Sequence, residues 1–307
     1  MIRALLLTLA LLAVAPASAS AVVIGIADQK PDLFDDRRFL RLGIKHARIS
    51  VPWDAMRYPW QVEELDLWMN GARARGVHPL VSFNTSRIAS LRHVLPSPDE
   101  LAHEFRIFRA RYPWVWNFAT WNEANVCAQS TCRRERLVAA YYHRLKIECP
   151  RCRVLAAEVL DMPNMVKWVR RFRRAYRRYG LGEPRLWGLH NYVEANRFKT
   201  GSVELLLRST KGSVWVTEVG GIVKRRKVRG RRHSGVEGIP ESKAHAARVT
   251  RFLLRKVLPR YRRVTRMYLY QWNSSTRRDT WDSAFIGPDD RPRPALRVLR
   301  RELERRR

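Results

Sequence analysis

Short apolar runs alternate with amphipathic stretches along most of this chain. The apolar runs are rich in β-branched and aromatic residues and end in polar residues or glycine, a pattern typical of buried strands. Eight such runs are present, at residues 22–28, 46–53, 77–84, 112–121, 153–161, 185–192, 213–219 and 266–273.

Each run is followed by a stretch with helical periodicity. In the second stretch, for example, Val62, Leu65 and Trp68 fall on one face of a helix. Helices are expected at residues 35–43, 61–76, 97–111, 133–148, 165–179, 202–209 and 241–258, and from Pro292 or Pro294 onward. Strands and helices that alternate in this way predict a parallel sheet with right-handed crossovers.

Two features favour a closed barrel over an open doubly wound sheet. There are eight strand–helix units, and polar or aromatic residues stand at the C-terminal ends of nearly every strand, where a barrel collects its active site. No glycine-rich phosphate loop follows the first strand, which counts against a nucleotide-binding sheet. We therefore predict an α/β protein with a single-domain (β/α)8 TIM barrel over residues 22–307.

Residues 1–21 have the pattern of a secretory signal peptide. A cationic Arg3 precedes an apolar core, and small residues up to Ala21 suit the cleavage site. The apolar core is well short of the roughly 20 residues that span a bilayer. We therefore expect a secreted, extracellular protein with no membrane span.

Arginine dominates the charge of the chain, which has 60 Lys and Arg against 28 Asp and Glu and a formal net charge of +32. Such a balance can indicate nucleic-acid binding, but the arginines are spread over nearly every expected helix. We therefore expect solvated helix faces with non-specific affinity for polyanions, and no specific nucleic-acid partner. Basic residues are concentrated only at residues 220–235, after the seventh strand. This segment is expected to be either a solvated loop or a site that recognises acidic sugars.

The four cysteines form two close pairs, Cys127 with Cys132 and Cys149 with Cys152. At roughly 1.5 Å of rise per residue, the helix expected at residues 133–148 separates the pairs too widely for one metal to join them. The second pair has the spacing of a redox dithiol, but it follows a helix C-terminus, whereas a reactive thiolate is stabilised at an N-terminus. Two local disulfides are therefore expected, and no metal site.

Two glutamates at strand ends carry the candidate chemistry. Glu123 follows the fourth strand and Glu218 ends the seventh. These strands lie roughly opposite each other in an eight-stranded barrel, so the two carboxylates can converge across its mouth. Retaining hydrolysis of a glycoside needs such a pair, a nucleophile and an acid/base about 5 Å apart.

At these positions the sequence resembles the clan A glycoside hydrolases, among them cellulases and family 39 glycosidases. Asn122 and Glu123 match the clan's asparagine and acid/base glutamate after strand four, and Glu218 matches its nucleophile. Further matches, at strands two, six and eight, are Arg48, His190, Tyr192 and Trp272. The resemblance implies a retaining (β/α)8 enzyme that needs no metal or organic cofactor.

The resemblance also implies roles for the matching residues. Arg48 and Tyr192 would support the charge of Glu218, Asn122 would bond the sugar 2-hydroxyl, and Trp272 would form an aromatic floor under the sugar. Other strand-end residues are candidates for substrate contacts, namely Asp28, Trp53 and Asn84. Glu158, in the fifth strand, is the rival carboxylate.

The sequence therefore predicts a retaining glycoside hydrolase that cleaves O-glycosidic bonds of a poly- or oligosaccharide. Glu123 is the expected acid/base and Glu218 the expected nucleophile. Two alternatives remain open, a catalytically inactive carbohydrate-binding barrel and a secreted basic protein that binds polyanions. The sugar, the linkage and the oligomeric state do not follow from the sequence.

Overall fold

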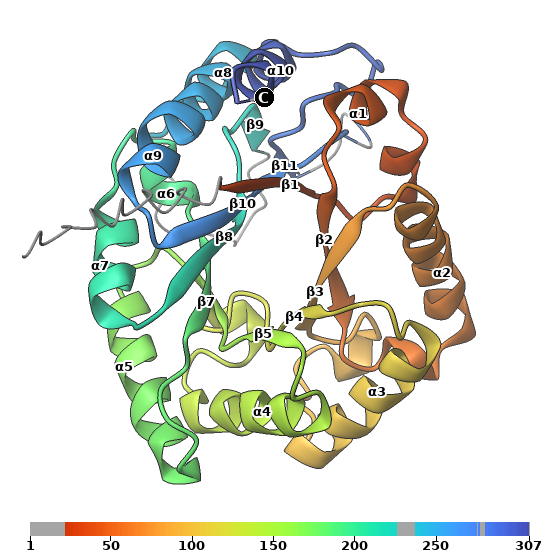
Figure 1. The fold of residues 1–307 in the computed structure, drawn as a ribbon, viewed down its shortest axis with the longest axis vertical. Helices are drawn as coiled ribbons and strands as arrows, with labels where there is room; N and C mark the ends of the chain where they lie inside the picture. The colour runs from red at the N-terminus through yellow and green to blue at the C-terminus, as the bar shows by residue number, and fades with distance from the viewer. Residues whose placement is uncertain (1–21, 226–236, 275, 277–279, 307) are drawn as a thin grey trace, which may run out of the picture.

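A ring of parallel strands surrounded by helices makes up the protein (Figure 1). The computed structural model describes residues 22–225, 237–274, 276 and 280–306. The predicted signal peptide, residues 1–21, and most of the basic loop, residues 226–236, lie outside the described residues. The strands form one nine-stranded sheet in the order β5-β4-β3-β2-β1-β10-β8-β7-β6.

The fifth predicted strand is broken in two. β5 (Arg153–Leu155) pairs with β4 (Asn117–Ala119), and β6 (Glu158–Leu160) pairs with β7 (Leu186–His190). β5 and β6 therefore fill one strand position between two neighbours, which leaves eight positions for the nine strands.

Backbone hydrogen bonds at the break join both neighbouring strands to this segment. The N–H of Ala156 donates to Leu186, and the N–H of Glu158 donates to Trp121. The ring is thus closed, and the predicted single (β/α)8 TIM barrel is confirmed.

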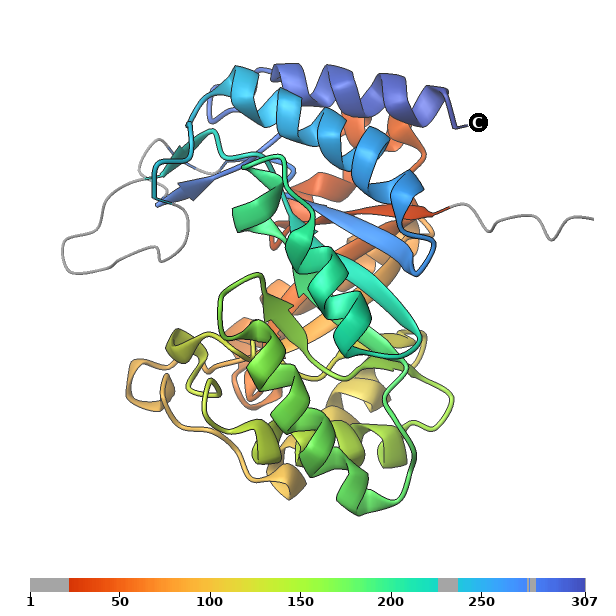
Figure 2. The ribbon, with the colours of Figure 1, turned by 90° about the vertical axis from the view of Figure 1, so that its left-hand side faces the viewer.

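The other strands lie close to their predicted ranges. They are β1 (Val23–Ala27), β2 (His46–Pro52), β3 (His78–Asn84), β8 (Ser213–Val219) and β10 (Val264–Tyr270). The longer helices are α1 (Arg37–Leu42), α2 (Pro59–Ala74), α3 (Pro98–Arg111), α4 (Glu135–Glu148), α5 (Met165–Tyr176), α7 (Gly201–Ser209), α8 (Lys243–Phe252) and α10 (Pro294–Glu304). Figure 2 shows α8 and α10 side by side.

Local signals explain several of the helix boundaries. Asp36 caps α1 by accepting the N–H of Arg38, and Gly43 ends that helix in the left-handed conformation. Ser97 and Glu100 form a reciprocal capping box at the start of α3. These short-range interactions are encoded by neighbouring residues, which is why the predicted helices are close to the observed ones.

The prediction of a long fourth strand at residues 112–121 is wrong. Only Asn117–Ala119 form β4. Pro113 lacks an N–H for the ladder, and the residues from Tyr112 to Trp116 form a turn instead. The aromatic residues there suggested a buried strand, but the Trp116 side chain is 46% exposed.

The barrel has an apolar interior below its polar mouth. Side chains that point inward from six strand positions form this cluster: Ala27, Leu80, Ala119, Leu155, Trp215 and Tyr268. A larger core lies between the strands and the helices. Within the described ranges, no helix is both long and apolar enough to cross a membrane.

Candidate active site

Arg48 lies at the centre of the polar network at the mouth of the barrel. Its side chain is 2% exposed and comes from β2. Nε and Nη2 donate to the two oxygens of Glu158 at 2.8 and 2.6 Å. Nη1 donates to Glu218 at 2.8 Å and Nη2 to Asn122 at 2.7 Å. One guanidinium from β2 therefore joins groups from three other strand positions of the barrel.

Glu158 anchors this arginine and is itself fully buried. The hydroxyl of Ser82 also donates to its carboxylate. The strand next to it is close, because a Cβ on Gly188 would lie 2.6 Å from Cγ of Glu158. Burial would raise the pKa of Glu158, but Arg48 and His190 outweigh it and hold that pKa below its usual range. Its complete burial rules out the role of a rival carboxylate that contacts substrate.

His190, at the end of β7, joins the two glutamates that the sequence analysis singled out. Its Nδ1 lies 3.2 Å from Oε1 of Glu123 and 4.0 Å from Oε2 of Glu218. Both distances start at one atom, so the two carboxylate oxygens can be no farther apart than their sum. The other ring nitrogen lies 3.7 Å from Glu158. Three carboxylates thus surround one buried imidazole.

The charge of His190 follows from these neighbours. Burial lowers the pKa of the imidazole, but Glu218, Glu123 and Glu158 together raise it to about 9. The ring is therefore an imidazolium at neutral pH, and it adds a second buried cation to that of Arg48.

This raised pKa predicts how stability depends on pH. The folded state holds the His190 proton more tightly than the unfolded chain, whose value is near 6.5. Its contribution, about 3 kcal/mol, is therefore complete below pH 6.5 and is lost as pH rises through 9. Urea unfolding of wild type and His190→Asn across this window measures the effect. Parallel stability curves for the two proteins would contradict it.

Tyr192 supports Glu218 from the other side. It opens the short helix α6 (Tyr192–Ala195) instead of ending the sixth strand, and its hydroxyl donates to Oε1 of Glu218 at 2.9 Å. The backbone N–H groups of Val193 and Glu194 donate to the buried carboxylate of Asp161. Asp161 thereby holds the first turn of α6 and, with it, the position of the tyrosine.

Glu123 has a backbone conformation that is rare for a residue with a side chain. Its φ is 43°, in the left-handed region, which costs free energy outside glycine. Hydrogen bonds on both sides hold it there, since the N–H of Asn122 donates to Phe83 and that of Ala124 to Glu158. The conformation turns the chain sharply after the fourth strand.

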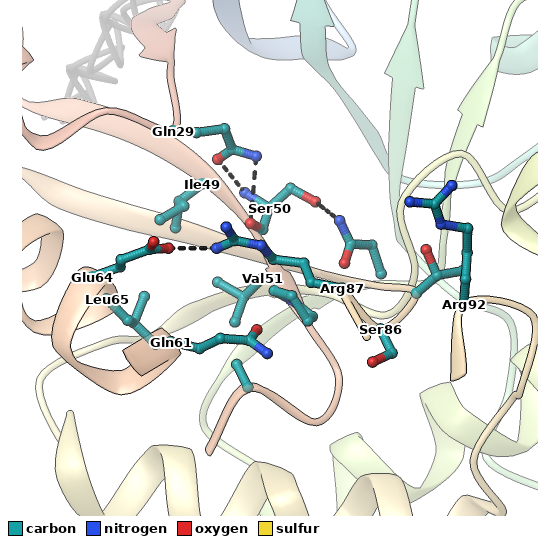
Figure 3. Close-up of a pocket in the computed structure, with 14 residues that line it drawn as sticks. Gln29, Ile49, Ser50, Val51, Gln61, Glu64, Leu65, Ser86, Arg87 and Arg92 are labelled. Carbon is teal, nitrogen blue, oxygen red and sulfur yellow. Dashed lines mark hydrogen bonds and ion pairs between the residues drawn. The ribbon is translucent and has the colours of Figure 1, made fainter. Parts of the chain in front are cut away.

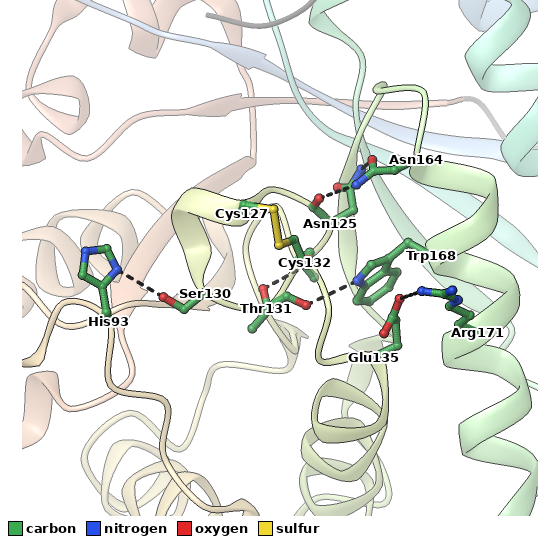
Figure 4. Close-up of a disulfide and its surroundings, with 11 residues drawn as sticks. His93, Asn125, Cys127, Ser130, Thr131, Cys132, Glu135, Asn164, Trp168 and Arg171 are labelled. Carbon is green, nitrogen blue, oxygen red and sulfur yellow. Dashed lines mark hydrogen bonds and ion pairs between the residues drawn. A yellow bond between two sulfur atoms is a disulfide. The ribbon is translucent and has the colours of Figure 1, made fainter. Parts of the chain in front are cut away.

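The loop after Glu123 is fastened to the next strand–helix unit (Figure 4). The side chain of Asn125 accepts the N–H of Leu160 and donates to its carbonyl, and Asn164 donates to the carbonyl of Asn125. The disulfide between Cys127 and Cys132 closes the same loop. This clamp was not apparent from the sequence, because an asparagine in a loop has no distinctive pattern.

Both predicted disulfides are confirmed, Cys127 with Cys132 and Cys149 with Cys152. The described part of the chain contains no group of three or more His, Cys, Asp or Glu side chains arranged to hold a metal ion.

Three of the residues that were expected to contact substrate are buried away from the mouth of the barrel. Trp272 is completely buried, with its ring against Phe39 and its indole N–H on Asp36, so the prediction of an aromatic floor at this residue is wrong. Strand β10 ends at Tyr270, and the chain then turns Trp272 outward into the core between barrel and helices.

Asp28 and Trp53 are also structural. The buried Asp28 carboxylate pairs with Lys30 and accepts the N–H of Trp272, which fastens the end of β1 to the end of β10. Trp53 is buried beneath the guanidinium of Arg57, 4.6 Å from its ring. The predictions that these side chains contact substrate are therefore wrong, since neither is accessible to a sugar.

Tyr270 is the aromatic side chain that β10 brings to the mouth. It is partly buried above the inner cluster, and its ring meets Tyr192 edge to face with centroids 6.4 Å apart. Inward-facing residues alternate along a strand, and Tyr268 is one of them. This alternation was the signal that could have identified Tyr270.

Asn84 lines a cleft of about 610 Å³ at the ends of β2 and β3 (Figure 3). Its amide donates to the hydroxyl of Ser50 at 2.7 Å. The exposed Arg87 and Arg92 lie on the same cleft, and Arg87 pairs with Glu64. Of the expected polar contacts beside the central network, Asn84 is therefore the one that the fold leaves accessible.

The structure is similar to solved proteins that share its barrel fold. One similar structure is a family 5 hydrolase (GH5_18) from Streptomyces cattleya in complex with GlcNAc, with a TM-score of 0.66 and 15% identity over 94% of this chain and 81% of that one. Another is a psychrophilic family 10 endo-β-1,4-xylanase, with a TM-score of 0.64 and 13% identity over 91% and 96% of the two chains. The structural neighbours are clan A glycoside hydrolases.

A family 39 glycoside hydrolase from Bacteroides cellulosilyticus WH2 is also similar, with a TM-score of 0.60 and 14% identity. The alignment covers 93% of this chain, which spans 64% of that protein's length. No protein-family model and no curated protein sequence matches the chain. At these identities the similarity establishes the shared barrel fold.

Proposed function

We propose that this protein is a retaining glycoside hydrolase with Glu123 as acid/base and Glu218 as nucleophile. The observation that carries the proposal is the contact of both carboxylates with one nitrogen of His190. Their side chains are 23% and 17% exposed, whereas Arg48, Glu158 and His190 behind them are buried. Double displacement on a sugar requires two accessible carboxyl groups that lie close together, one as nucleophile and one as acid/base.

In the first step, Glu218 attacks the anomeric carbon while Glu123 gives its proton to the departing glycosidic oxygen. The carbon–oxygen bond breaks and a glycosyl ester on Glu218 forms. In the second step, Glu123 takes a proton from water, which attacks the same carbon and releases Glu218. Arg48 and Tyr192 donate hydrogen bonds to the two oxygens of Glu218 and hold its carboxylate in position for attack.

The other groups at the mouth are suited to hold a sugar. Arg48 fixes the amide of Asn122 through its oxygen, which orients this side chain beside the nucleophile. Tyr270 offers the aromatic face under the sugar that the sequence had led us to expect from Trp272. The cleft beside Asn84, at the ends of β2 and β3, offers room for further units of a longer carbohydrate substrate. The two disulfides agree with a secreted protein, because such bonds persist in oxidising compartments.

Replacing the acid/base is the direct test of this proposal. Glu123→Gln is expected to reduce kcat on an alkyl glycoside or an oligosaccharide by about 10²–10⁴-fold, because the leaving oxygen is no longer protonated. Bond cleavage in a dinitrophenyl glycoside should change far less, since that leaving group needs no proton. Steady-state and burst kinetics on both substrates measure the difference.

An equal loss on the two substrates would contradict the role of Glu123 as acid. NMR of the first-formed product tests retention, and an inverted anomer would rule out the double displacement. Sugar binding without turnover in the wild-type protein, over a panel of glycosides and polysaccharides, would favour the inactive carbohydrate-binding barrel.

A further inference from the structure

The opposite end of the barrel from the glutamates contains another cavity, of about 410 Å³. It lies at the N-terminal ends of β2, β3, β4, β5 and β10. The polar residues that line it are His46, His78, Asn117, Arg151, Arg153 and Arg266. The side chains of Trp114 and Trp116 complete its wall.

This cavity is lined by cations without a counter-charge. No aspartate or glutamate is among its lining residues. Over the part of the chain that the structure describes, none of its three arginines forms an ion pair with a carboxylate. Three guanidinium groups around one hollow repel one another, and no carboxylate among the residues that line it offsets them.

Arg266 shows the missing charge most clearly. Three arginines in the described ranges are buried, and two of them have carboxylate partners: Arg48 pairs with Glu158 and Glu218, and Arg293 with Asp282. Arg266 is 8% exposed, yet its contacts are the ring of Trp215 at 4.0 Å and the neutral groups of Tyr268 and His46 at 3.4 Å each. A buried guanidinium without an anion is costly, so a bound anion would offset that cost.

Two further groups at the cavity support the binding of an anion there. Burial lowers the pKa of His46 to about 4, and the nearby Arg266, His78 and Arg153 lower it further. The side-chain oxygen of Asn117 is buried and has no hydrogen-bond partner, while its nitrogen donates to Pro79. A ligand that carries both negative charge and a hydroxyl group would satisfy the arginines and this oxygen together.

We propose that this cavity binds a phosphate-type oxyanion, either inorganic phosphate or the phosphate group of a larger molecule. Arg266 contributes the buried cation, Arg151 and Arg153 lie over the anion at the rim, and Asn117 accepts a hydrogen bond from a hydroxyl of the ligand. Guanidinium groups suit such a ligand because they donate parallel hydrogen bonds to two of its oxygens. The site is separate from the glutamates, so it does not depend on the proposed hydrolase activity.

Calorimetric titration with inorganic phosphate, at constant ionic strength in chloride, tests the proposal on the full-length protein. Wild type should bind one equivalent saturably, and low-millimolar phosphate should raise its Tm over chloride alone. Arg153→Ser and Arg151→Ser remove exposed side chains, so they should fold normally yet each weaken binding about tenfold or more. Arg266→Gln should abolish it. Arg170→Ser, on the exposed face of α5, is the matched control and should bind as wild type.

Absence of saturable heat and of a Tm shift in wild type would overturn the proposal, as would equal losses in the rim variants and in Arg170→Ser. Phenyl phosphate distinguishes the two sources of the anion. Tighter binding than inorganic phosphate assigns the tryptophan wall to a larger phosphorylated ligand, and equal binding assigns the site to free phosphate. Turnover of an aryl glycoside by Arg153→Ser should equal that of wild type, which separates this test from that of the glutamates.

Discussion

Replacing Glu218 by glutamine is expected to lower kcat on an aryl glycoside by about 10⁴-fold or more. The amide cannot form the glycosyl ester. The two-step route is therefore lost whether the substrate has a good or a poor leaving group. This differs from the acid/base variant, whose defect depends on the leaving group. The fold should survive, because Glu218 is partly exposed and its loss leaves Arg48 paired with the fully buried Glu158.

Azide gives the decisive form of this experiment. In Glu218→Gly, azide can occupy the vacated space and attack the anomeric carbon directly, so activity should return and the product should be a glycosyl azide of inverted configuration. In Glu123→Gly, azide should instead intercept the glycosyl ester and give the retained azide. NMR of the two products assigns the roles. The inverted azide from Glu123→Gly would exchange the two assignments, and circular dichroism of each variant serves as the control for folding.

Replacing Arg48 by methionine is expected to lower the free energy of unfolding by about 3–5 kcal/mol. The substitution keeps most of the side-chain volume but leaves Glu158 buried beside Glu218 with one cation fewer. Removal of one partner from a buried ion pair costs more than the pair itself contributes, because the remaining charge stays away from water. Urea unfolding at neutral pH measures the loss.

Two variants control this prediction. Arg87→Met removes an arginine whose partner Glu64 is also exposed, and it should cost less than about 1 kcal/mol. Arg48→Met combined with Glu158→Gln removes the orphaned charge together with the arginine, and it should recover part of the loss. An Arg48→Met protein as stable as Arg87→Met would show that the network at the barrel mouth does not hold the fold together.

The arrangement of eight strand–helix units could be predicted because it depends on local patterns. Apolar runs, helical periodicity and caps such as Ser97 with Glu100 act over a few residues, and the closed barrel is the arrangement that buries all of these faces. The same local patterns gave a wrong prediction for the aromatic stretch at residues 112–121. Its composition suits a strand, but Pro113 removes a ladder hydrogen bond and the chain forms a turn.

The roles of single side chains depended on contacts between distant strands. Arg48 and Glu158 are far apart in sequence, and nothing local shows that one buries its charge against the other. Trp272 and Tyr270 both lie near the end of β10, yet only the side chain of Tyr270 faces the interior of the barrel. Asp28 has the polar character of a substrate contact, but it hydrogen-bonds the backbone of another strand.

The sequence by itself determined the barrel, the two disulfide pairs and the strand ends on which Glu123 and Glu218 stand. It could do so because hydrophobic period, capping and short cysteine spacing are properties of neighbouring residues. Only the tertiary structure decided which polar groups are accessible, which carboxylate neutralises which arginine, and that Arg266 has no carboxylate partner among the described residues. Burial and charge pairing arise when strands remote in sequence come within a few ångströms, and there the dielectric environment sets the chemistry of each group.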